Sequence, residues 1–222
     1  MEAILEQLVR SPKFLLYLDE LTEARRREQE AREQFYQNLD EDVREEFING
    51  EVVRQMTSRD SHSMAVANIG RLMHIFATVH GLDAVRTEQA LTVFPRNDYA
   101  PDICFWTVGK SAHLTGKTTK YPVPDLICEV LSESTESRDR GVKFEDYAFH
   151  GVAEYWLVDP DQRVIEQYAA VAGVYEPVGR FTVGAVRSRV IAGFELPTEA
   201  AFDERANLAA LWKLRPEDTT ST

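Results

Sequence analysis

Two acidic residues in the middle of the sequence lie where a charge needs a partner. Glu129 interrupts the apolar run 126–131, a pattern typical of a strand buried on both faces. A carboxylate in such a strand must be paired or must bind a cation. Asp102 opens a second apolar run, residues 101–106. If the two strands are neighbours, the carboxylates converge, and such a pair is tolerated when a cation lies between them.

The chemistry expected of such a pair is metal-assisted hydrolysis. Carboxylate oxygens suit Mg²⁺ or Mn²⁺, so Asp102 and Glu129 are candidate metal ligands. Asp125 stands four residues before Glu129, on the same strand face, and is a candidate further ligand or outer partner. Lys143 follows on an expected helix, where an amine can orient or deprotonate a water and offset charge on a phosphate. Two strand acids and a lysine form the minimal set for phosphodiester hydrolysis.

Apolar periodicity and turn residues predict the elements that position this set. Most of residues 1–48 should be helical, with Ser11 as an N-cap and Pro12 in the first turn. An Asn-Gly turn at 49–50 should open a strand. We expect further helices over 62–79 (capped by Asp60 or Ser61), 135–150 and 202–214. We expect strands over 51–56, 84–86 and 90–94 (a hairpin or one bent strand), 101–106, 124–131, 153–159, 164–169, 174–178, 181–183 and 186–191, and a polar loop or flap over 110–123.

This order of elements predicts an α/β fold with a mixed sheet flanked by helices. A parallel strand pair in such a sheet needs a crossover, and the helix 135–150 occupies the right place in the chain.

Length and composition suit one domain of moderate size with an appendage: 222 residues, 44% hydrophobic and 28% charged. No apolar run approaches the ~18 residues of a membrane span, and the first residues lack the pattern of a secretory signal. We therefore expect a cytoplasmic protein without a membrane partner. Cys104 and Cys128 lie in apolar runs and are expected to be core thiols in a reducing compartment.

The net charge of −12 argues at first against a nucleic-acid partner. The acidity is concentrated in the flanks, however. Residues 1–50 and 144–222 each hold 7 basic and 13 acidic side chains, whereas residues 51–143 hold 11 of each sign. The charge therefore weakens the case for DNA without removing it.

Each candidate residue also has an ordinary structural interpretation. Asp102 is also compatible with an acid that hydrogen-bonds its own turn, and Glu129 with a buried salt bridge to Arg54 or Arg71. Lys143, taken alone, is better explained as an exposed helix lysine. The three residues together, in this order, favour the site.

Other polar residues are less decisive. His62 is better explained as a neighbour of a helix cap than as a ligand. Glu51 fits a place at the site and a surface pairing equally well. A lysine-rich loop most often means solvated charge, with phosphate contacts as the alternative, and Tyr155 and Trp156 alternate along an apolar strand as core residues do. The lysines of that loop are Lys110, Lys117 and Lys120.

Several motifs taken together resemble one known family. They are Pro101-Asp102; Pro124-Asp125-Leu-Ile-Cys-Glu129-Val-Leu-Ser132; Arg138-Asp-Arg-Gly-Val-Lys143-Phe-Glu-Asp-Tyr147-Ala; and Gly151-Val-Ala-Glu-Tyr155-Trp156-Leu-Val-Asp-Pro160. This pattern resembles the bacterial Uma-two family of putative restriction endonucleases, part of the PD-(D/E)xK nuclease-like superfamily. The likeness runs from about Glu46 to Leu214, and Glu46-Phe-Ile-Asn-Gly-Glu51-Val with His62 also fits it. The segment with Arg32 and Phe35-Tyr36 resembles a subgroup with an N-terminal helical extension.

The resemblance implies a helical arm over residues 1–45 and a restriction-endonuclease-like domain over 46–214; composition adds a disordered tail over 215–222. It also implies Mg²⁺ or Mn²⁺ held by Asp102 and Glu129, with Lys143 as the catalytic lysine and Asp125, Glu51 and His62 as possible accessory residues. The expected activity is cleavage of DNA by water attack on a phosphodiester.

One position departs from the wider superfamily, in which the usual lysine lies two residues after the strand acid. That position here is Leu131, and the resemblance places the lysine on the following helix instead. This displaced lysine and the acidic flanks leave open an inactive nuclease-fold binding or scaffold module. Hydrolysis of RNA or another phosphodiester also stays open, because the sequence has no base-reading motif that chooses among nucleic acids. We also expect a homodimer, because the arm offers an apolar stripe for pairing two sites.

Overall fold

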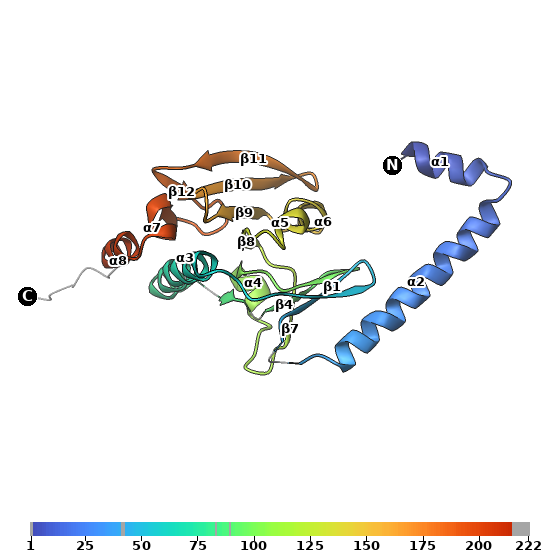
Figure 1. Ribbon diagram of the computed structural model, residues 1–222, viewed down its shortest axis with the longest axis horizontal. Helices are drawn as coiled ribbons and strands as arrows, with labels where there is room; N and C mark the ends of the chain where they lie inside the picture. The colour runs from blue at the N-terminus through green and yellow to red at the C-terminus, as the bar shows by residue number, and fades with distance from the viewer. Residues whose placement is uncertain (1, 41–42, 83, 89, 215–222) are drawn as a thin grey trace, which may run out of the picture. The chain divides into compact units, whose positions relative to one another are not determined.

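The computed structural model describes residues 2–40, 43–82, 84–88 and 90–214 (Figure 1). The tail predicted over 215–222 lies outside these ranges. The chain forms two compact units: a smaller one, Met1–Gln55 with Arg96–Asp98, and a larger one, Met56–Pro95 with Tyr99–Thr222. The domain boundary expected after residue 45 stays a prediction; the compact units divide after Gln55. In the part of the chain described, no helix has the length and apolar character needed to cross a membrane.

The smaller unit contains two helices and a hairpin: α1 (Glu2–Arg10), α2 (Phe14–Gln37), β1 (Glu45–Ile48) and β2 (Glu51–Arg54). Its helical part agrees with the predicted arm, but α2 begins later than expected. Lys13, rather than Ser11, precedes its first turn, and Ser11 Oγ accepts a hydrogen bond from the Lys13 amide at 3.1 Å. Asn49 and Gly50 both have positive φ, as expected for an Asn-Gly hairpin turn.

The end of α2 is anchored within this unit. Arg32 donates to both carboxylate oxygens of Asp98, at 2.7 and 2.6 Å, and Tyr36 donates to the same carboxylate at 2.9 Å. Phe35 stacks on Phe47 of β1 with ring centroids 5.7 Å apart. Asp98 is fully buried, so the arginine is the cation that its charge requires.

The larger unit is built on a mixed six-stranded sheet with strand order β11-β10-β9-β8-β6-β3. Only β8 and β9 run parallel; the other neighbours are antiparallel. The strands are β3 (Val85–Thr87), β6 (Ile103–Phe105), β8 (Leu126–Val130), β9 (Glu154–Asp159), β10 (Val164–Val171) and β11 (Val174–Phe181). The predicted α/β fold with a mixed sheet flanked by helices is confirmed.

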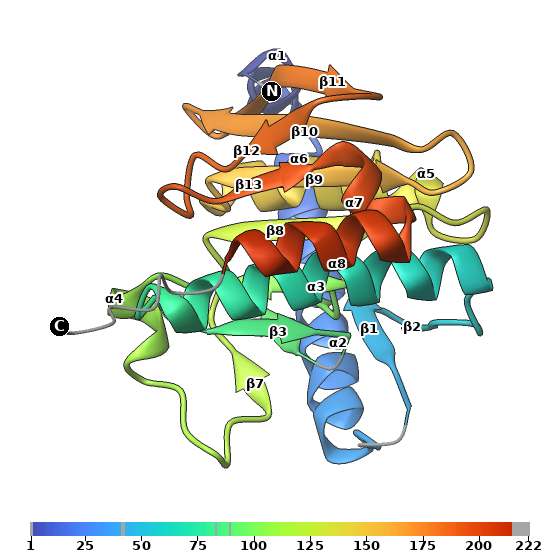
Figure 2. The same cartoon turned by 90° about the vertical axis from the view of Figure 1, so that its left-hand side faces the viewer.

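Helices cover both faces of this sheet. On one face, α3 (Asp60–Val79) runs beside α8 (Glu204–Lys213), with α7 (Thr198–Phe202) next to them (Figure 2). Their apolar side chains form the core with alternate residues of the strands, including Cys128 and Val130. On the other face lie α5 (Glu136–Asp139) and α6 (Val142–Phe149), which form the predicted crossover between β8 and β9.

The crossover is two helices rather than the single helix expected over 135–150. The break falls at Gly141, whose φ and ψ are −112° and −108°. A Cβ at this position would lie 2.6 Å from the carbonyl oxygen of Ser137. The chain therefore turns tightly here, and glycine is the residue that this close approach of backbone permits.

Other predicted elements also differ in detail. The segments 84–86 and 90–94 do not pair with each other: β3 pairs with β6, and β4 (Leu91–Val93) lies parallel to β7 (Lys120–Tyr121). The expected loop over 110–123 contains the end of α4 (Val108–Ser111) and β7. The strands expected at 174–178 and 181–183 are one strand, β11, and β12 (Ala185–Arg187) pairs with β13 (Glu195–Pro197). The helix expected over 202–214 starts at Glu204, because Asp203 caps it by accepting from the Ala206 amide at 2.8 Å.

Candidate active site

The register of β6 against β8 brings Asp102 and Glu129 together. Ile103 lies opposite Cys128, so the residue before β6 lies opposite Glu129. The Asp102 amide donates to Glu129 Oε2 at 3.1 Å, and the Val130 amide donates to Asp102 Oδ2 at 2.7 Å. Each carboxylate is thus held by a backbone amide of the other strand.

Glu129 faces away from the main apolar core. Cys128 and Val130 point into the core beneath α3, so the alternation of a strand turns Glu129 to the opposite face, where α6 lies. Asp102 and Glu129 are only 4% and 2% exposed. At this depth their charges need partners that stay in place.

Lys143 supplies the main cation of the cluster. It belongs to α6, is 1% exposed, and its Nζ lies 3.0 Å from Glu129 Oε1. The same Nζ lies 3.2 Å from Asp139 Oδ1, one helical turn earlier in the chain. The ordinary interpretation of Lys143 as an exposed helix lysine is therefore wrong.

Two residues of the cluster were not predicted as site residues, Asp139 and Tyr147. Asp139 is 1% exposed and pairs with Lys143, and Tyr147 donates its hydroxyl to Glu129 Oε1 at 2.9 Å. Their spacing of four residues on either side of Lys143 is the sequence signal that they share. Aromatic rings close the cluster: Tyr147 packs edge-on against Tyr99 and Tyr155.

His62 lies closer to the site than its position beside a helix start suggested. It is the third residue of α3, and its Nε2 lies 3.3 Å from Asp102 Oδ2. Only 7% of His62 is exposed. The helix start therefore directs an imidazole toward one of the two strand acids.

Asp125 lies elsewhere, with partners of its own. Its Oδ2 accepts from the amide and hydroxyl of Thr107 at 2.7 and 2.8 Å, and its Oδ1 lies 2.8 Å from Lys110 Nζ. Period two did place it on the face of Glu129, but four residues of strand span about 13 Å. Burial alone would raise the pKa of the Asp125 carboxyl, but Lys110 and Thr107 outweigh burial and lower that pKa.

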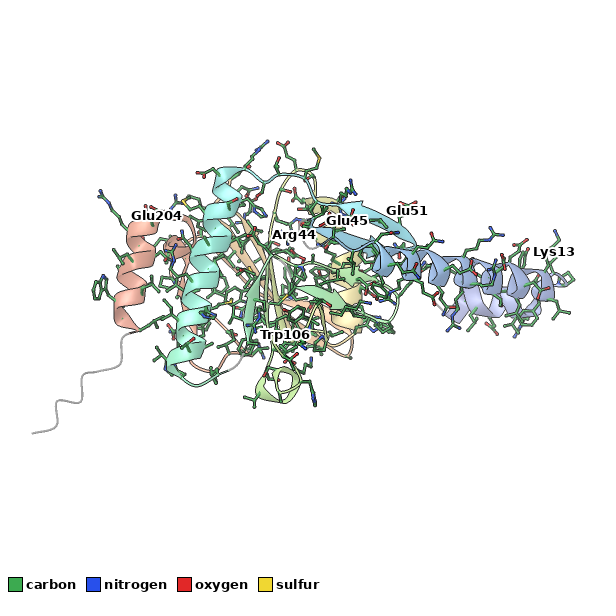
Figure 3. The ribbon with its side chains drawn as sticks, turned by 90° about the horizontal axis from the view of Figure 1, so that it is seen from below. Lys13, Arg44, Glu45, Glu51, Trp106 and Glu204 are labelled. Carbon is green, nitrogen blue, oxygen red and sulfur yellow. The ribbon has the colours of Figure 1, made fainter. Side chains whose placement is uncertain are left out.

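Two further points concern the partners of Glu129 and the position of Glu51, whose role at the site stays a prediction. Glu51 belongs to the β1–β2 hairpin of the smaller unit, where it is exposed (Figure 3). The arginines considered as partners of Glu129 bind other residues: Arg54 pairs with Glu45, and Arg71 donates to Asn207. The cation that pairs with Glu129 is Lys143 instead.

The donor set fits a magnesium-type ion. Asp102 and Glu129 offer carboxylate oxygens from adjacent strands, anchored by backbone amides. Within the described ranges, no group of three or more histidine, cysteine, aspartate or glutamate side chains is arranged to hold a metal. Mg²⁺ commonly binds through one or two carboxylates and completes its shell with waters and substrate phosphates, so two acids suffice.

Comparison with known proteins identifies the family and the fold. A family model described as "Uma2: Putative restriction endonuclease" matches residues 32–199. Among solved structures, the chain is similar to one titled a putative nuclease from Anabaena variabilis, with a TM-score of 0.67 and 17% identity over 77% of this chain and 96% of that chain. At this identity the likeness shows the fold, which is the nuclease-like α/β fold that the sequence predicted. A search of curated proteins found no match.

Proposed function

Since the chain belongs to the Uma2 family of putative restriction endonucleases, we propose that it is a metal-dependent endonuclease that hydrolyses phosphodiester bonds in DNA. One observation carries this proposal beyond the family. Asp102, Glu129 and Lys143 come from a strand entry, a strand and a helix, and they meet in one buried cluster. We assign the metal to Asp102 and Glu129, and we assign the catalytic amine to Lys143.

The bound Mg²⁺ or Mn²⁺ would supply Lewis acidity toward the phosphate and activate the attacking water. The chain's own residues hold the carboxylates and the amine in fixed positions. Backbone amides fix both carboxylates, so the acids need not reorganise when the substrate arrives. Lys143, held between Glu129 and Asp139, places a positive charge where negative charge develops on the phosphate.

The displaced lysine does not weaken this assignment. The usual position, two residues after the strand acid, is the buried Leu131, but Lys143 reaches Glu129 from α6 at 3.0 Å. A lysine is therefore present beside the Glu129 carboxylate, although it comes from a helix and not from the strand. This supports an enzyme over an inactive scaffold, which remains the second candidate because of the net charge of −12.

Plasmid cleavage tests the proposal. Purified protein is incubated with supercoiled DNA in Mg²⁺ or Mn²⁺, beside the near-isosteric variants Asp102→Asn and Glu129→Gln. We expect the parent protein to nick or linearise the plasmid and each variant to lose at least about 100-fold in rate, the scale of electrostatic catalysis by one group. Glu176→Gln, an exposed acid on β11, is the matched control. Equal cleavage by all the proteins would identify a contaminant.

Calorimetric titration with Mn²⁺ separates the two candidates. Binding that is lost in Glu129→Gln but kept in Glu176→Gln supports the enzyme. Absence of binding at millimolar Mn²⁺ supports the scaffold. Circular dichroism on each variant confirms that any lost binding does not reflect unfolding.

We further propose that two copies of the chain pair through the arm. Several large apolar side chains on α1 and the first half of α2 are exposed, and a soluble helix seldom presents so many without a partner. They are Ile4, Leu5, Val9, Leu15, Leu16, Leu18 and Leu21. A twofold pair would supply two cleavage sites. The buried thiols Cys104 and Cys128 support a reducing compartment such as the cytoplasm.

A further inference from the structure

A groove runs along α3 beside the edge strand β3, and we call it the α3 groove. Two adjoining cavities of about 610 and 280 Å³ form it, and they share His74, Val85 and Arg86. The helix lines it with residues three or four positions apart, which form one stripe of α3. These residues are Ser63, Ala67, Arg71, His74 and Thr78.

Small residues keep the groove open. Gly70 lies on the same side of α3, and a Cβ there would come within 2.7 Å of Thr87 Cγ2. Helix and strand therefore approach closely at this point. Toward the start of α3 the lining residues are Ser63, Val66 and Ala67. The space beside them is hollow because the helix presents no long side chain.

One end of the groove adjoins the candidate active site. Ser63 follows His62, whose imidazole lies 3.3 Å from Asp102. On the opposite wall, the Glu88 amide donates to the Asp102 carbonyl oxygen at 2.9 Å. The registers of β3, β6 and β8 thus align Glu88, Asp102 and Glu129 across three strands. A chain molecule lying in the groove would therefore end beside Asp102, one of the two acids to which we assign the metal.

Among the described residues that line the groove, two are arginines and one is an acid, so this lining is net positive. Arg71 and Arg86 are exposed on it, and among the residues that the structure describes neither forms an ion pair. Both arginines donate to neutral oxygens: Arg71 to Asn207 Oδ1 at 3.1 Å and Arg86 to the Val85 carbonyl at 2.8 Å. These bonds orient the guanidinium groups and leave their charge available. Glu88, the acid that lines the groove, lies at the end next to Asp102.

The chemistry of this lining matches a phosphate chain. Guanidinium groups bind phosphate through paired N–H donors, and hydroxyls add neutral contacts. Ser63 and Thr78 lie fifteen positions apart on the helix, about 22 Å, which corresponds to about six nucleotides of one DNA strand at ~3.4 Å each. An acidic peptide would meet Glu88 and the strand acids at one end, whereas a nucleic acid meets them through a divalent cation.

We infer that the α3 groove holds the sugar–phosphate backbone of the DNA strand that flanks the scissile bond, with Arg71 and Arg86 as its phosphate contacts. The inference rests on the proposed endonuclease function and adds the path of the substrate.

Fluorescence anisotropy with a labelled DNA duplex of about 20 base pairs, in EDTA so that no cleavage occurs, tests the groove. Affinity is measured over a series of salt concentrations for the parent protein and for Arg71→Gln/Arg86→Gln. Each lost phosphate contact removes about 0.9 from the slope of log K against log salt. We expect the double variant to bind at least about tenfold more weakly and its slope to fall by about 2.

Matched variants identify the cause of any change. Arg180→Gln/Arg187→Gln removes the same charge from β11 and β12 and should keep both affinity and slope. Arg71→Lys/Arg86→Lys should keep most of the slope, because it keeps the charge. Ala67→Glu, at an exposed position inside the groove, should weaken binding without removing a native contact.

Three outcomes overturn the inference: equal binding and slope for the parent and the glutamine double variant, an equal loss in the control pair, or no DNA binding by the parent protein. Plasmid cleavage separates this failure from that of the proposed function. If the parent cleaves DNA but the groove variants bind it normally, the groove assignment alone is wrong. If the groove variants lose binding but the parent cleaves nothing in Mg²⁺ or Mn²⁺, the endonuclease proposal fails and the binding site stands.

Discussion

The ammonium group of Lys143 lies 3.0 Å from Glu129 Oε1, and both side chains are almost fully buried. Asp139 shares this cation at 3.2 Å. A buried charge that loses its partner is far more costly than an exposed one, because no water replaces the lost contact. The same residue that we assign to catalysis is therefore also a structural residue.

Lys143→Met should strongly destabilise the fold, because it leaves Glu129 and Asp139 without their shared cation. Breaking a buried pair in this way typically costs about 3–5 kcal/mol. Urea unfolding monitored by circular dichroism measures the loss. Lys213→Met, at the exposed end of α8, should change the unfolding free energy by no more than about 0.5 kcal/mol. Similar values for the two variants would contradict the buried pairing.

Asp139→Asn should slow cleavage without removing the metal site. Asp139 contacts Lys143, the amine that we assign to catalysis, so we expect it to act as a positioning residue. Loss of such outer contacts typically costs about 10- to 100-fold in activity. We expect Mn²⁺ affinity by calorimetry to stay close to that of the parent while plasmid cleavage falls. A parallel loss of Mn²⁺ binding would show instead that Asp139 supports the metal ligands.

Gly141→Ala should destabilise the crossover between β8 and β9. The added Cβ would lie 2.6 Å from the Ser137 carbonyl oxygen, a backbone atom that cannot rotate away. Overpacking of this kind typically costs about 1–3 kcal/mol. Thermal unfolding measures it, with Gly109→Ala as the control, because a Cβ at Gly109 meets no atom within 4 Å. An unchanged Tm for Gly141→Ala would show that the break between α5 and α6 relaxes without cost.

Asp125 should make the fold sensitive to acid. Its pKa in the folded protein is lowered, because Lys110 and Thr107 outweigh the effect of burial. A carboxyl with a lowered folded pKa stabilises the fold above its unfolded pKa of about 3.9, and this contribution disappears as the pH falls through the folded pKa. Asp125→Asn should therefore be less stable than the parent at neutral pH, with the difference shrinking below about pH 4.

Urea unfolding between about pH 2.5 and pH 7 measures the Asp125 effect. The exposed Glu176→Gln serves as its control. A constant difference in unfolding free energy between the parent and Asp125→Asn across this range would contradict the assignment to Lys110 and Thr107.

The arm should mediate self-association through its apolar stripe. Leu15, Leu18 and Leu21 are 71%, 47% and 61% exposed, and their replacement by Gln removes apolar area without touching the Arg32–Asp98 pair that anchors α2. Light scattering should show a dimer for the parent and a monomer for the triple variant. Glu20→Gln, exposed on α2 beside the stripe, should remain dimeric. A monomeric parent would end the dimer proposal.

Much of the sheet follows from the sequence because its strands are apolar runs. β8 and the β8–β9 crossover lie where the pattern placed them. The meeting of Asp102 and Glu129 also followed, since it needed only that two such strands be neighbours. Asp125 shows the limit of this reasoning: the period of two gives the face of a strand but not distance along it, and Asp125 binds Lys110 instead.

The rest of the site depends on contacts between segments far apart in the chain. His62 faces Asp102 across a gap of forty residues that no local pattern records. The burial of Lys143 depends on which side of α6 meets the sheet, and the periodicity of one continuous helix could not give that side because the helix breaks at Gly141. Asp139 and Tyr147 can be predicted as members of the cluster only once Lys143 is known to point inward.

The catalytic amine that we assign lies on a helix, α6, rather than on the strand of the acid. This position affects how related proteins can be detected from their sequences and how they can diverge. A lysine on a strand is tied to the acid two positions before it, so the pair shifts together. Here the amine sits on a separate element, and insertions in the connecting segment can adjust its reach while the acids stay still. The spacing between acid and lysine along the sequence is then a poor guide to relatedness. The feature to compare between such proteins is the position of the lysine ammonium beside the acids.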